Sequence, residues 1–425
     1  MRIVMMTNTF LPMVGGVSRS VAWFSEAFRE VGHDVLVVAP QFDGKTDGET
    51  DVVRIPAIRH FNGSDFSVGL PVPGILLPVL EQFDPEIIHA HHPFLLGDTA
   101  LRVAASFNIP AVFTHHTMYE QYTHYVPGNS EVMRHFAVHL ATEFANLCDH
   151  VIAPSESVEA IIRSRGVLTP ITTIPTGIDT AAFAEGSREA GRRAAGLPAD
   201  AEVVGHVGRL AVEKNLPFLA DGVAAAIRKR PRARFLVVGE GPASAAVRGI
   251  FEAAGCGRQL LLAGRLEGRA LADAYAAMDL FAFASRSETQ GLVLAEAMAA
   301  GLPVVALDAP GARDVVEDGR NGRLLSAESG EQEFAAAVAG LLDGGESIEQ
   351  FREAARRTAA GFDRRGCGSR LLDVYRQLLG NGHRAAVSDR SPLAAAWRRL
   401  GEEWDMLAGK SAAAADALAA AFFSR

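Results

Sequence analysis

Two glutamates eight positions apart, Glu288 and Glu296, lie between the apolar runs 280–284 and 304–306. These runs are typical of buried strands, and the segment between them predicts a helix that begins near Gly291. Glu288 is then expected in the loop above a strand end, and Glu296 in the second helical turn. Carboxylates accept hydrogen bonds from hydroxyls, and the amides at a helix start donate to phosphate. The stretch therefore predicts a site for a ligand that carries both groups.

Two cations follow another apolar run in the same half of the chain. Arg209 and Lys214 come after the run 203–207, in the loop before the next helical segment. A guanidinium offers a fork of donors and an ammonium offers a point charge, so the two together suit a diphosphate. The alternative is a pair of solvated surface cations.

Two glycine loops have the composition of phosphate-binding turns. Gly15 and Gly16 stand between the first apolar run and a helical segment, where a ligand can approach the backbone and the helix N-terminus. A plain tight turn is the alternative there. The loop 239–244 comes near the dinucleotide fingerprint G-x-G-x-x-G/A, but Ser244 occupies its third position. A tight turn with Pro242 at the start of a helix explains that loop better than NAD binding.

Histidines gather in the first half of the chain. The adjacent pairs 91–92 and 115–116 each follow an apolar run, which places one member of each pair at the rim of a ligand site. His135 and His139 are four apart on a predicted helix, as in a metal pair, but no glutamate completes an H-E-x-x-H motif. We therefore expect no metal.

The order of the elements that position these residues predicts an α/β chain. Apolar runs alternate with helix-length segments up to about residue 153, and the alternation restarts at 203–207 after a polar stretch. Such strands are typical of parallel sheets covered on both faces. We expect two doubly wound domains facing across a cleft, with ligands at the carboxyl ends of the strands. The expected limits are a first domain over 1–175, a linker over 176–200, a second domain over 201–360, a crossover helix region over 361–380 and a helical tail over 381–425.

Composition excludes several classes of protein. The 425 residues are 48% hydrophobic, which excludes a wholly disordered chain. The net charge of −9 argues against a nucleic-acid binder. The three cysteines form no C-x-x-C pair, so we expect neither a disulfide framework nor a cysteine zinc site. The widely spaced cysteines indicate the reducing cytosol as the compartment. The best apolar run, 68–80, carries three prolines, so we expect a soluble or peripheral protein without a membrane span.

The last 45 residues predict an amphipathic helix. Apolar residues follow at alternating spacings of four and three, and the stripe comprises Leu393, Trp397, Leu400, Trp404, Leu407, Ala414 and Leu418. The stripe is expected to dock on the chain's own surface or on a second subunit, as in a homo-oligomer. Contact of the two tryptophans with a membrane is the alternative.

Together these motifs resemble family 4 of the retaining GT-B glycosyltransferases. The resemblance covers about residues 1–380. It rests on Gly-Arg-Leu and Glu-Lys-Asn within 208–215, the E-x7-E element 288–296, Gly-Leu-Pro-Val-Val at 301–305, the loop at 15–16 and Asp-Val-Tyr at 373–375. It implies two Rossmann-like domains, a nucleotide-sugar donor in the cleft, and a final helix that crosses back to the first domain.

The resemblance also implies roles for single residues. On the donor side, Arg209 and Lys214 would bind the diphosphate, and Glu296 would accept from the ribose hydroxyls. Glu288, with the backbone at Gln290, Gly291 and Leu292, would hold the sugar and the distal phosphate. The backbone at Arg265 and Leu266 would lie near the base, and the loop of Gly15 and Gly16 would contact a phosphate through Gly16.

His116 and Glu288 are the catalytic residues that the resemblance implies. His116 is placed near the anomeric carbon, where it orients the sugar, shares the developing charge or acts as a general base. No Asp-x-Asp motif stands at a strand end, in keeping with metal-free chemistry and no cofactor besides the nucleotide-sugar substrate. Retention without an enzymic nucleophile implies front-face attack assisted by the leaving phosphate.

A narrower resemblance concerns the acceptor. The stretches 91–97 and 114–127 are similar to the bacterial diacylglycerol glucosyltransferase branch, which transfers glucose from UDP-glucose to membrane diacylglycerol. This places Tyr119, Glu120, Tyr122 and His124 on the acceptor side, and the protein peripherally on the inner face of the plasma membrane. The alternatives are another sugar or a soluble acceptor, an epimerase or phosphorylase on the same scaffold, and a binding subunit without activity.

Overall fold

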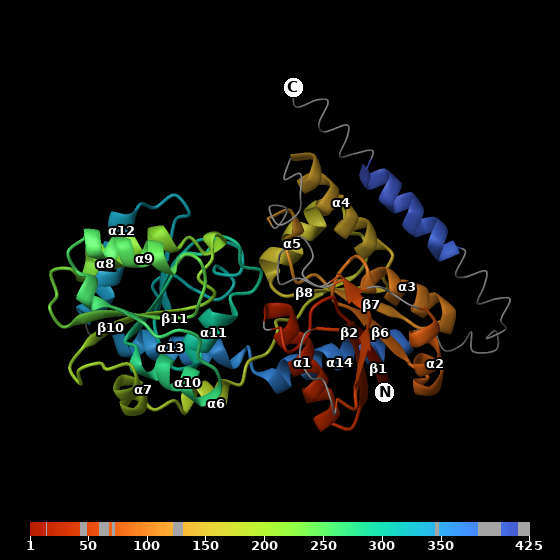
Figure 1. The fold of residues 1–425 in the computed structure, drawn as a ribbon, viewed down its shortest axis with the longest axis horizontal. Helices are drawn as coiled ribbons and strands as arrows, with labels where there is room; N and C mark the ends of the chain where they lie inside the picture. The colour runs from red at the N-terminus through yellow and green to blue at the C-terminus, as the bar shows by residue number, and fades with distance from the viewer. Residues whose placement is uncertain are drawn as a thin grey trace. The chain divides into compact units, whose positions relative to one another are not determined.

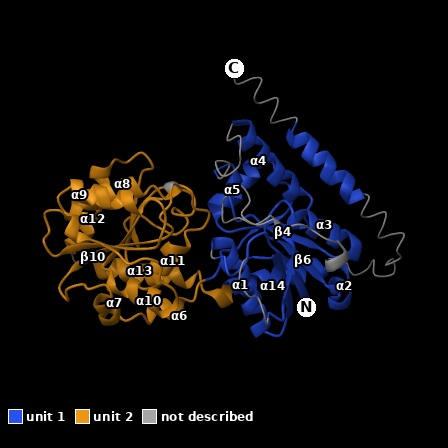
Figure 2. Ribbon diagram, in the orientation of Figure 1, with its two compact units in different colours: residues 1–177, 367–425 blue, residues 178–366 orange. Residues whose placement is uncertain are grey.

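The structure of the chain, a computed structural model, divides into two compact units. The first comprises residues 1–177 and 367–425, and the second comprises residues 178–366 (Figures 1 and 2). The residues described are 1–13, 15–42, 49–58, 68–69, 73–121, 131–344, 348–380 and 401–414.

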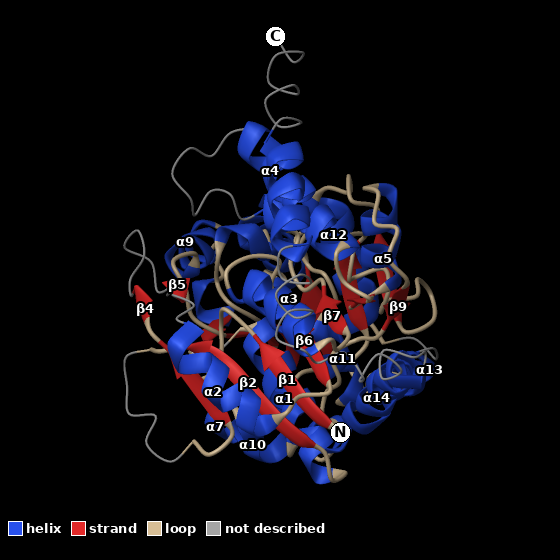
Figure 3. Cartoon of the chain, turned by 90° about the vertical axis from the view of Figure 1, so that its right-hand side faces the viewer, coloured by secondary structure: helices blue, strands red, loops and turns tan. Residues whose placement is uncertain are grey.

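The first unit is built on a parallel sheet of seven strands in the order β3-β2-β1-β6-β7-β8-β9 (Figure 3). The strands are β1 (Arg2–Met6), β2 (Asp34–Pro40), β3 (Val52–Ile55), β6 (Ile87–Ala90), β7 (Ala111–Thr114), β8 (His150–Ala153) and β9 (Ile171–Thr173). A separate antiparallel pair is formed by β4 (Ala57–Ile58) and β5 (Val68–Gly69). The strand order reverses between β1 and β6, which marks the edge where ligands bind in such sheets.

Alternate residues of these strands feed two cores, one on each face of the sheet. Val4 and Met6 belong to one core, while Ile3 and Met5 belong to the other, because side chains alternate along a strand. The first core is covered by α2 (Pro73–Phe83), α3 (Leu96–Phe107), α4 (Glu131–Asn146) and α5 (Glu156–Ser164), and the second by α1 (Gly16–Glu30) and α14 (Arg364–Gly380). Tyr375 of α14 is fully buried in the second core.

The second unit repeats the design with a parallel sheet of six strands in the order β12-β11-β10-β13-β14-β15. The strands are β10 (Glu202–Val207), β11 (Ala233–Val238), β12 (Leu260–Leu262), β13 (Leu280–Phe283), β14 (Val304–Leu307) and β15 (Gly322–Leu325). The larger helices are α8 (Leu216–Ile227), α9 (Ser244–Ala253), α10 (Gly268–Ala277), α11 (Leu292–Ala299), α12 (Glu331–Leu342) and α13 (Ile348–Ala360), with 3₁₀ turns at Val212–Lys214 and Gly257–Gln259. Here the order reverses between β10 and β13. The two doubly wound sheets confirm the predicted fold class.

The stretch 176–200, expected to be a linker, instead contains two short helices of the second unit. They are α6 (Thr180–Ala184) and α7 (Arg188–Ala194), and both pack on α10. Asp179 and Ser187 cap them by accepting hydrogen bonds from backbone amides. Gly191 allows the close packing, because a Cβ there would lie 1.9 Å from the carbonyl oxygen of Asp273. The polar composition of this stretch concealed these helices.

A helix over 401–414 docks on the first unit. Met406 joins the core under α3 and α4, and two ion pairs join Glu403 to Arg102 and Lys410 to Asp98. The buried or half-buried stripe of this helix is Glu402, Met406, Gly409, Lys410 and Ala413.

The docking face of this helix differs from the predicted apolar stripe. Trp404 and Leu407 are 72% and 61% exposed, so this part of the stripe faces away from the unit. The helix docks instead through the face of Met406, which is 4% exposed and belongs to the core of the first unit. Trp397, Leu400 and Leu418 lie outside the described residues. None of the helices that the structure describes is long and apolar enough to span a bilayer.

Candidate functional site

The carboxyl edge of the second sheet brings together the charged residues that the sequence singled out. β10 and β13 are neighbours, and the loops that follow them carry Arg209 and Lys214 on one side and Glu288 on the other. The strand order reverses at this point, which is the place where doubly wound sheets bind ligands.

Lys214 and Glu288 form an ion pair between their ammonium and carboxylate groups. Their side chains are only 18% and 19% exposed. Two further contacts hold the loops together. Asn215 donates from its side-chain amide to the carbonyl oxygen of Ala284 (3.2 Å), and the Ser287 hydroxyl donates to the carbonyl oxygen of Glu213 (3.2 Å). The pair is therefore fixed from both strands.

Arg209 occupies a more open position than Lys214. Its guanidinium pairs with Glu213, one turn along the loop, and its side chain is 55% exposed. A guanidinium has five N–H groups and can contact two anions at once, so a cation paired at the rim can also donate to an incoming diphosphate.

The start of α11 supplies backbone donors beside Glu288. Gly291 caps the helix with a φ of +69°, and Leu292 is the first helical residue. Gly311, with a φ of +78°, packs under this turn, where a Cβ would lie 2.8 Å from the amide nitrogen of Gln290 and 3.0 Å from the Cβ of Glu288. Both positions need glycine, because the left-handed region and the close approach exclude a side chain. The first amides of a helix have no intrahelical partner and suit a phosphate.

Glu296 lies on α11 and is 1% exposed. Its carboxylate accepts a hydrogen bond of 2.7 Å from the hydroxyl of Tyr275, a fully buried residue of α10. This partner could not be predicted, because in the sequence Tyr275 has the pattern of an ordinary helical core residue. One carboxylate oxygen of Glu296 is thus held within the unit.

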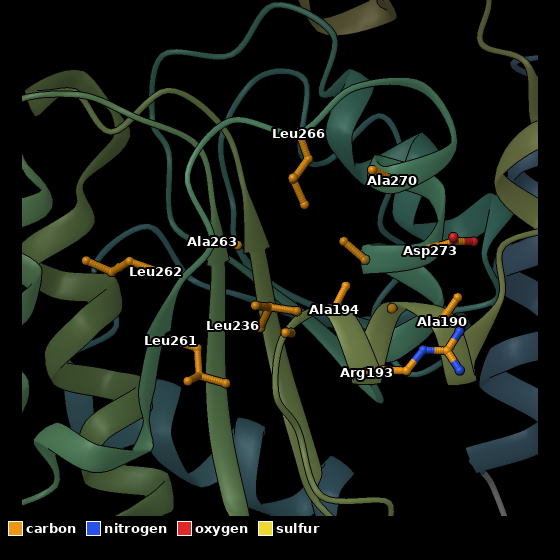
Figure 4. A pocket seen from close by; sticks show the side chains of 13 residues that line it. Ala190, Arg193, Ala194, Leu236, Leu261, Leu262, Ala263, Leu266, Ala270 and Asp273 are labelled. Carbon is orange, nitrogen blue, oxygen red and sulfur yellow. The ribbon is translucent and has the colours of Figure 1, made fainter.

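Arg265 and Leu266 follow β12, as expected. Arg265 pairs with Glu267 at 3.0 Å, and Leu266 points into a pocket of about 520 Å³ between the sheet and two helices (Figure 4). Its walls are mostly aliphatic and come from Leu236 of β11, from β12, and from α7 and α10. Sequence reasoning missed the contribution of α7, since that stretch was expected to be a linker.

The first unit has its own switch point between β1 and β6. Asn8 follows β1, and its amide N–H donates to Nδ1 of His92, which follows β6 (3.1 Å). Asn8 also donates to the carbonyl oxygen of Phe94 (3.0 Å) and accepts from the amide of Leu96 (3.2 Å). Asn8 was not a predicted site residue, although a polar residue at the end of a buried first strand is a recognisable signal.

His89, His91 and His116 form a stack at this edge. The ring centroids of His89 and His91 are 4.3 Å apart, and those of His91 and His116 are 5.2 Å apart. Nδ1 of His91 lies 2.9 Å from Nε2 of His116. The two ring nitrogens of His89 are both hydrogen-bonded, Nδ1 to the hydroxyl of Tyr375 (2.6 Å) and Nε2 to the hydroxyl of Thr114 (2.7 Å). The expected sugar-side histidine is thus held by core residues from β6, β7 and α14.

Burial keeps these imidazoles neutral. It lowers the pKa of His89 to about 3 and the pKa values of His91 and His116 well below the usual 6.5. The pKa of His115 falls to about 4 for the same reason. A charged imidazole is disfavoured in such surroundings, and neighbouring rings add repulsion.

The acceptor-side residues are described in part. Tyr119 packs its ring against His115 (5.8 Å) and Phe94 (5.5 Å), and Glu120 pairs with Arg165 at 2.8 Å. Tyr122 and His124 lie outside the described residues.

The glycine loop of the first unit leads into α1. Gly15 precedes the helix and Gly16 begins it, and a Cβ at either would meet nothing within 4 Å. Packing against the described residues therefore does not require glycine at these two positions.

The predicted absence of a metal is not tested by the geometry. His135 lies 3.7 Å from Glu131, one turn back on α4. Within the part of the chain that the structure describes, no three histidine, cysteine, aspartate or glutamate side chains gather as a metal site would require.

Comparison with known proteins fits this geometry. The model of Glycosyltransferase Family 4 matches residues 14–182, and that of Glycosyl transferases group 1 matches residues 201–344. The GDP-mannose-dependent alpha-mannosyltransferase of Corynebacterium glutamicum is 32% identical over 359 residues, which cover 81% of each chain. The alpha-monoglucosyldiacylglycerol synthase of Streptococcus pneumoniae is 28% identical over 345 residues, covering 80% of this chain and 77% of that protein.

Among solved structures, sucrose-phosphate synthase from Thermosynechococcus elongatus has the same two-domain fold. It matches with a TM-score of 0.73 at 22% identity, over 89% of this chain and 99% of that one. The family matches include the loops that carry Lys214, Glu288 and His116. The chain therefore belongs to family 4 of the GT-B glycosyltransferases and is a glycosyltransferase that uses a nucleotide sugar.

Proposed function

We propose that the chain transfers a hexosyl group, with retention and without a metal, from a nucleoside diphosphate hexose to a hydroxyl of a membrane lipid. The observation that carries the proposal is the Lys214–Glu288 pair at the switch point of the second sheet. A cation and a carboxylate fixed side by side match the junction between a diphosphate and a sugar. Glu296 on α11 and the loop of Arg265 and Leu266 then take the ribose and the base.

The chemistry requires that negative charge on the leaving diphosphate be stabilised as the glycosidic bond breaks. Lys214, Arg209 and the amides at the start of α11 supply that stabilisation, as preorganised donors do where charge develops. Glu288 holds sugar hydroxyls. As the family resemblance implies, His116 lies beside the anomeric carbon of the sugar, and the backbone of Gly16 contacts a phosphate.

GDP-mannose is the first donor to consider. The Corynebacterium relative, named as using GDP-mannose, is the more similar of the two relatives described. UDP-glucose, the donor expected from the sequence, is the second candidate, and a relative named as a monoglucosyldiacylglycerol synthase supports it. For either donor, the family resemblance places the nucleobase at the backbone of Arg265 and Leu266, beside the aliphatic pocket.

A membrane acceptor is proposed on the same grounds. The Streptococcus relative is named for a diacylglycerol product, and the stretches 91–97 and 114–127 resemble that branch. Tyr119 and Glu120 begin the acceptor side on this proposal. We propose diacylglycerol or a glycosylated derivative as the acceptor, and a peripheral position on the inner face of the plasma membrane.

The test is a transfer assay with the purified full-length chain. GDP-[¹⁴C]mannose and UDP-[¹⁴C]glucose are each incubated with phosphatidylglycerol vesicles that contain or lack diacylglycerol, and with a cellular lipid extract. Label in the lipid phase, in an α linkage by NMR, supports the proposal. Transfer only to soluble sugars contradicts the lipid acceptor. Conversion of the sugar by enzyme and donor alone indicates an epimerase, and sugar 1-phosphate formed with inorganic phosphate indicates a phosphorylase.

A further inference from the structure

The contact between His91 and His116 restricts which ring nitrogen of each histidine can hold a proton. The two neutral rings meet through Nδ1 of His91 and Nε2 of His116 at 2.9 Å. A neutral imidazole has one N–H and one lone pair, so one ring must donate and the other must accept. The choice fixes which nitrogen of His116 holds its proton.

The surroundings of His91 decide between the two arrangements. The ring is fully buried, and its Nε2 has no hydrogen-bond partner among the described residues. If His116 donated to Nδ1, His91 would have to carry its own proton on Nε2, as a buried N–H without an acceptor. Buried N–H groups without a partner are rare and costly, whereas an unused acceptor is better tolerated. The proton therefore lies on Nδ1 of His91.

His89 prevents His91 from turning out of this arrangement. Both nitrogens of His89 are bonded, to Tyr375 and Thr114, so its ring is fixed. It stacks on His91 at 4.3 Å with an angle of 25° between the planes. A flip of the His91 ring would place a carbon against Nε2 of His116 and cost the hydrogen bond.

We infer that His91 is a positioning residue that donates from Nδ1 to Nε2 of His116 and so fixes the His116 proton on Nδ1. His116 then presents an N–H and not a lone pair, and its other nitrogen is already occupied. Resting on the proposed function, this makes His116 a hydrogen-bond donor that orients the donor sugar. It excludes His116 as the general base that deprotonates the acceptor.

The first test reads the tautomer directly and needs no substrate. The full-length protein is labelled with ¹⁵N-histidine, and two-bond ¹⁵N–¹H spectra are recorded at pH 7.5, with His116→Ala to assign the ring. The inference expects Nδ1 of His116 protonated and Nε2 unprotonated. A protonated Nε2 on His116 would overturn it. This result stands whether or not the proposed transfer is found, so the two proposals fail separately.

The second test compares two substitutions of His91. In His91→Asn, the side-chain NH₂ lies near the position of the His Nδ1–H and can still donate, whereas His91→Leu cannot. We expect kcat within about threefold of wild type for His91→Asn, and a loss of about 10–100-fold for His91→Leu with KM for the donor little changed. His150→Leu is the control, because it also removes a histidine hydrogen bond, that of Nε2 to the hydroxyl of Thr172 (2.8 Å), and so shows how much activity is lost through lower stability alone. Equal activity of His91→Asn and His91→Leu would contradict the positioning role. If His91→Leu does not fold, the wild-type spectra decide.

Discussion

Lys214 and Glu288, 74 residues apart in the sequence, meet as an ion pair at the edge where β10 and β13 lie side by side. Each charge is mostly shielded from water and has the other as its partner. Breaking a shielded ion pair is destabilising, so either substitution affects the loops as well as the chemistry. The predictions for these two residues therefore include a measurement of folding.

Lys214→Ala is expected to weaken donor binding and to lower kcat. The ammonium contacts a diphosphate whose charge rises as the sugar leaves, and such a contact is worth roughly 2–4 kcal/mol, or about 30–1000-fold. Steady-state kinetics and calorimetric titration with GDP and UDP measure both effects. Lys229→Ala, at an exposed position near the end of α8, is the matched control. Wild-type turnover and nucleotide affinity in Lys214→Ala would show that the diphosphate lies elsewhere.

Glu288→Gln is expected to act on the sugar and not on the nucleotide. The amide keeps the shape of the side chain but removes the charge that accepts from sugar hydroxyls, so rate and donor choice should change together. Calorimetry with the free nucleotide should give an affinity close to that of wild type. A loss of nucleotide binding as large as that of Lys214→Ala, in a variant with normal thermal unfolding, would remove Glu288 from the sugar end.

Transfer is expected to persist in excess EDTA. We expect Arg209 and Lys214, the cations at the edge of the second sheet, to neutralise the leaving diphosphate without a divalent ion. The measurement is the initial rate after dialysis against EDTA, with and without added Mg²⁺ or Mn²⁺. Activity that returns only with one of these ions would refute metal-free transfer.

Docking of the helix over 401–414 is expected to weaken as the pH rises. Burial, with the nearby carboxylates of Asp405, Asp149 and Glu403, raises the pKa of Glu402 to about 7 from the usual 4.5. The docked state thus keeps a proton that the undocked state loses. The stability gained by docking is complete below pH 4.5 and is lost progressively as the pH rises through 7.

Hydrogen exchange of residues 401–414 at pH 5 and pH 8, corrected for intrinsic rates, measures this effect. Protection should fall at pH 8 in the wild type and stay constant in Glu402→Gln, which cannot ionise. The same loss of protection in Glu402→Gln would assign the pH dependence to another group.

Much of the fold follows from patterns that are local in the sequence. Continuous apolar runs between helices predict parallel sheets, and the residues at the strand ends, such as Arg209 and Glu288, lie at an edge in consequence. Contacts between distant segments were beyond prediction. Examples are the hydrogen bond of Tyr275 to Glu296, the hydrogen bond of Tyr375 to His89, and the packing of the helices within 176–200. These contacts depend on which surfaces meet in three dimensions, and no short sequence pattern encodes that.

Gly311→Ala is expected to disturb the site without touching a charged residue. Gly311 has a φ of +78°, which costs an alanine about 1–2 kcal/mol, and its new Cβ would lie 2.8 Å from the amide nitrogen of Gln290 and 3.0 Å from the Cβ of Glu288. The turn that presents Glu288 and the start of α11 must then shift. We expect lower thermal stability and a fall in kcat/KM. Gly340→Ala is the control, because it lies in the exposed part of α12 with nothing within 4 Å of a Cβ, and should gain about 0.5–1 kcal/mol. If both variants keep wild-type kcat/KM while only Gly311→Ala loses stability, the packing of Gly311 supports the fold but does not position Glu288.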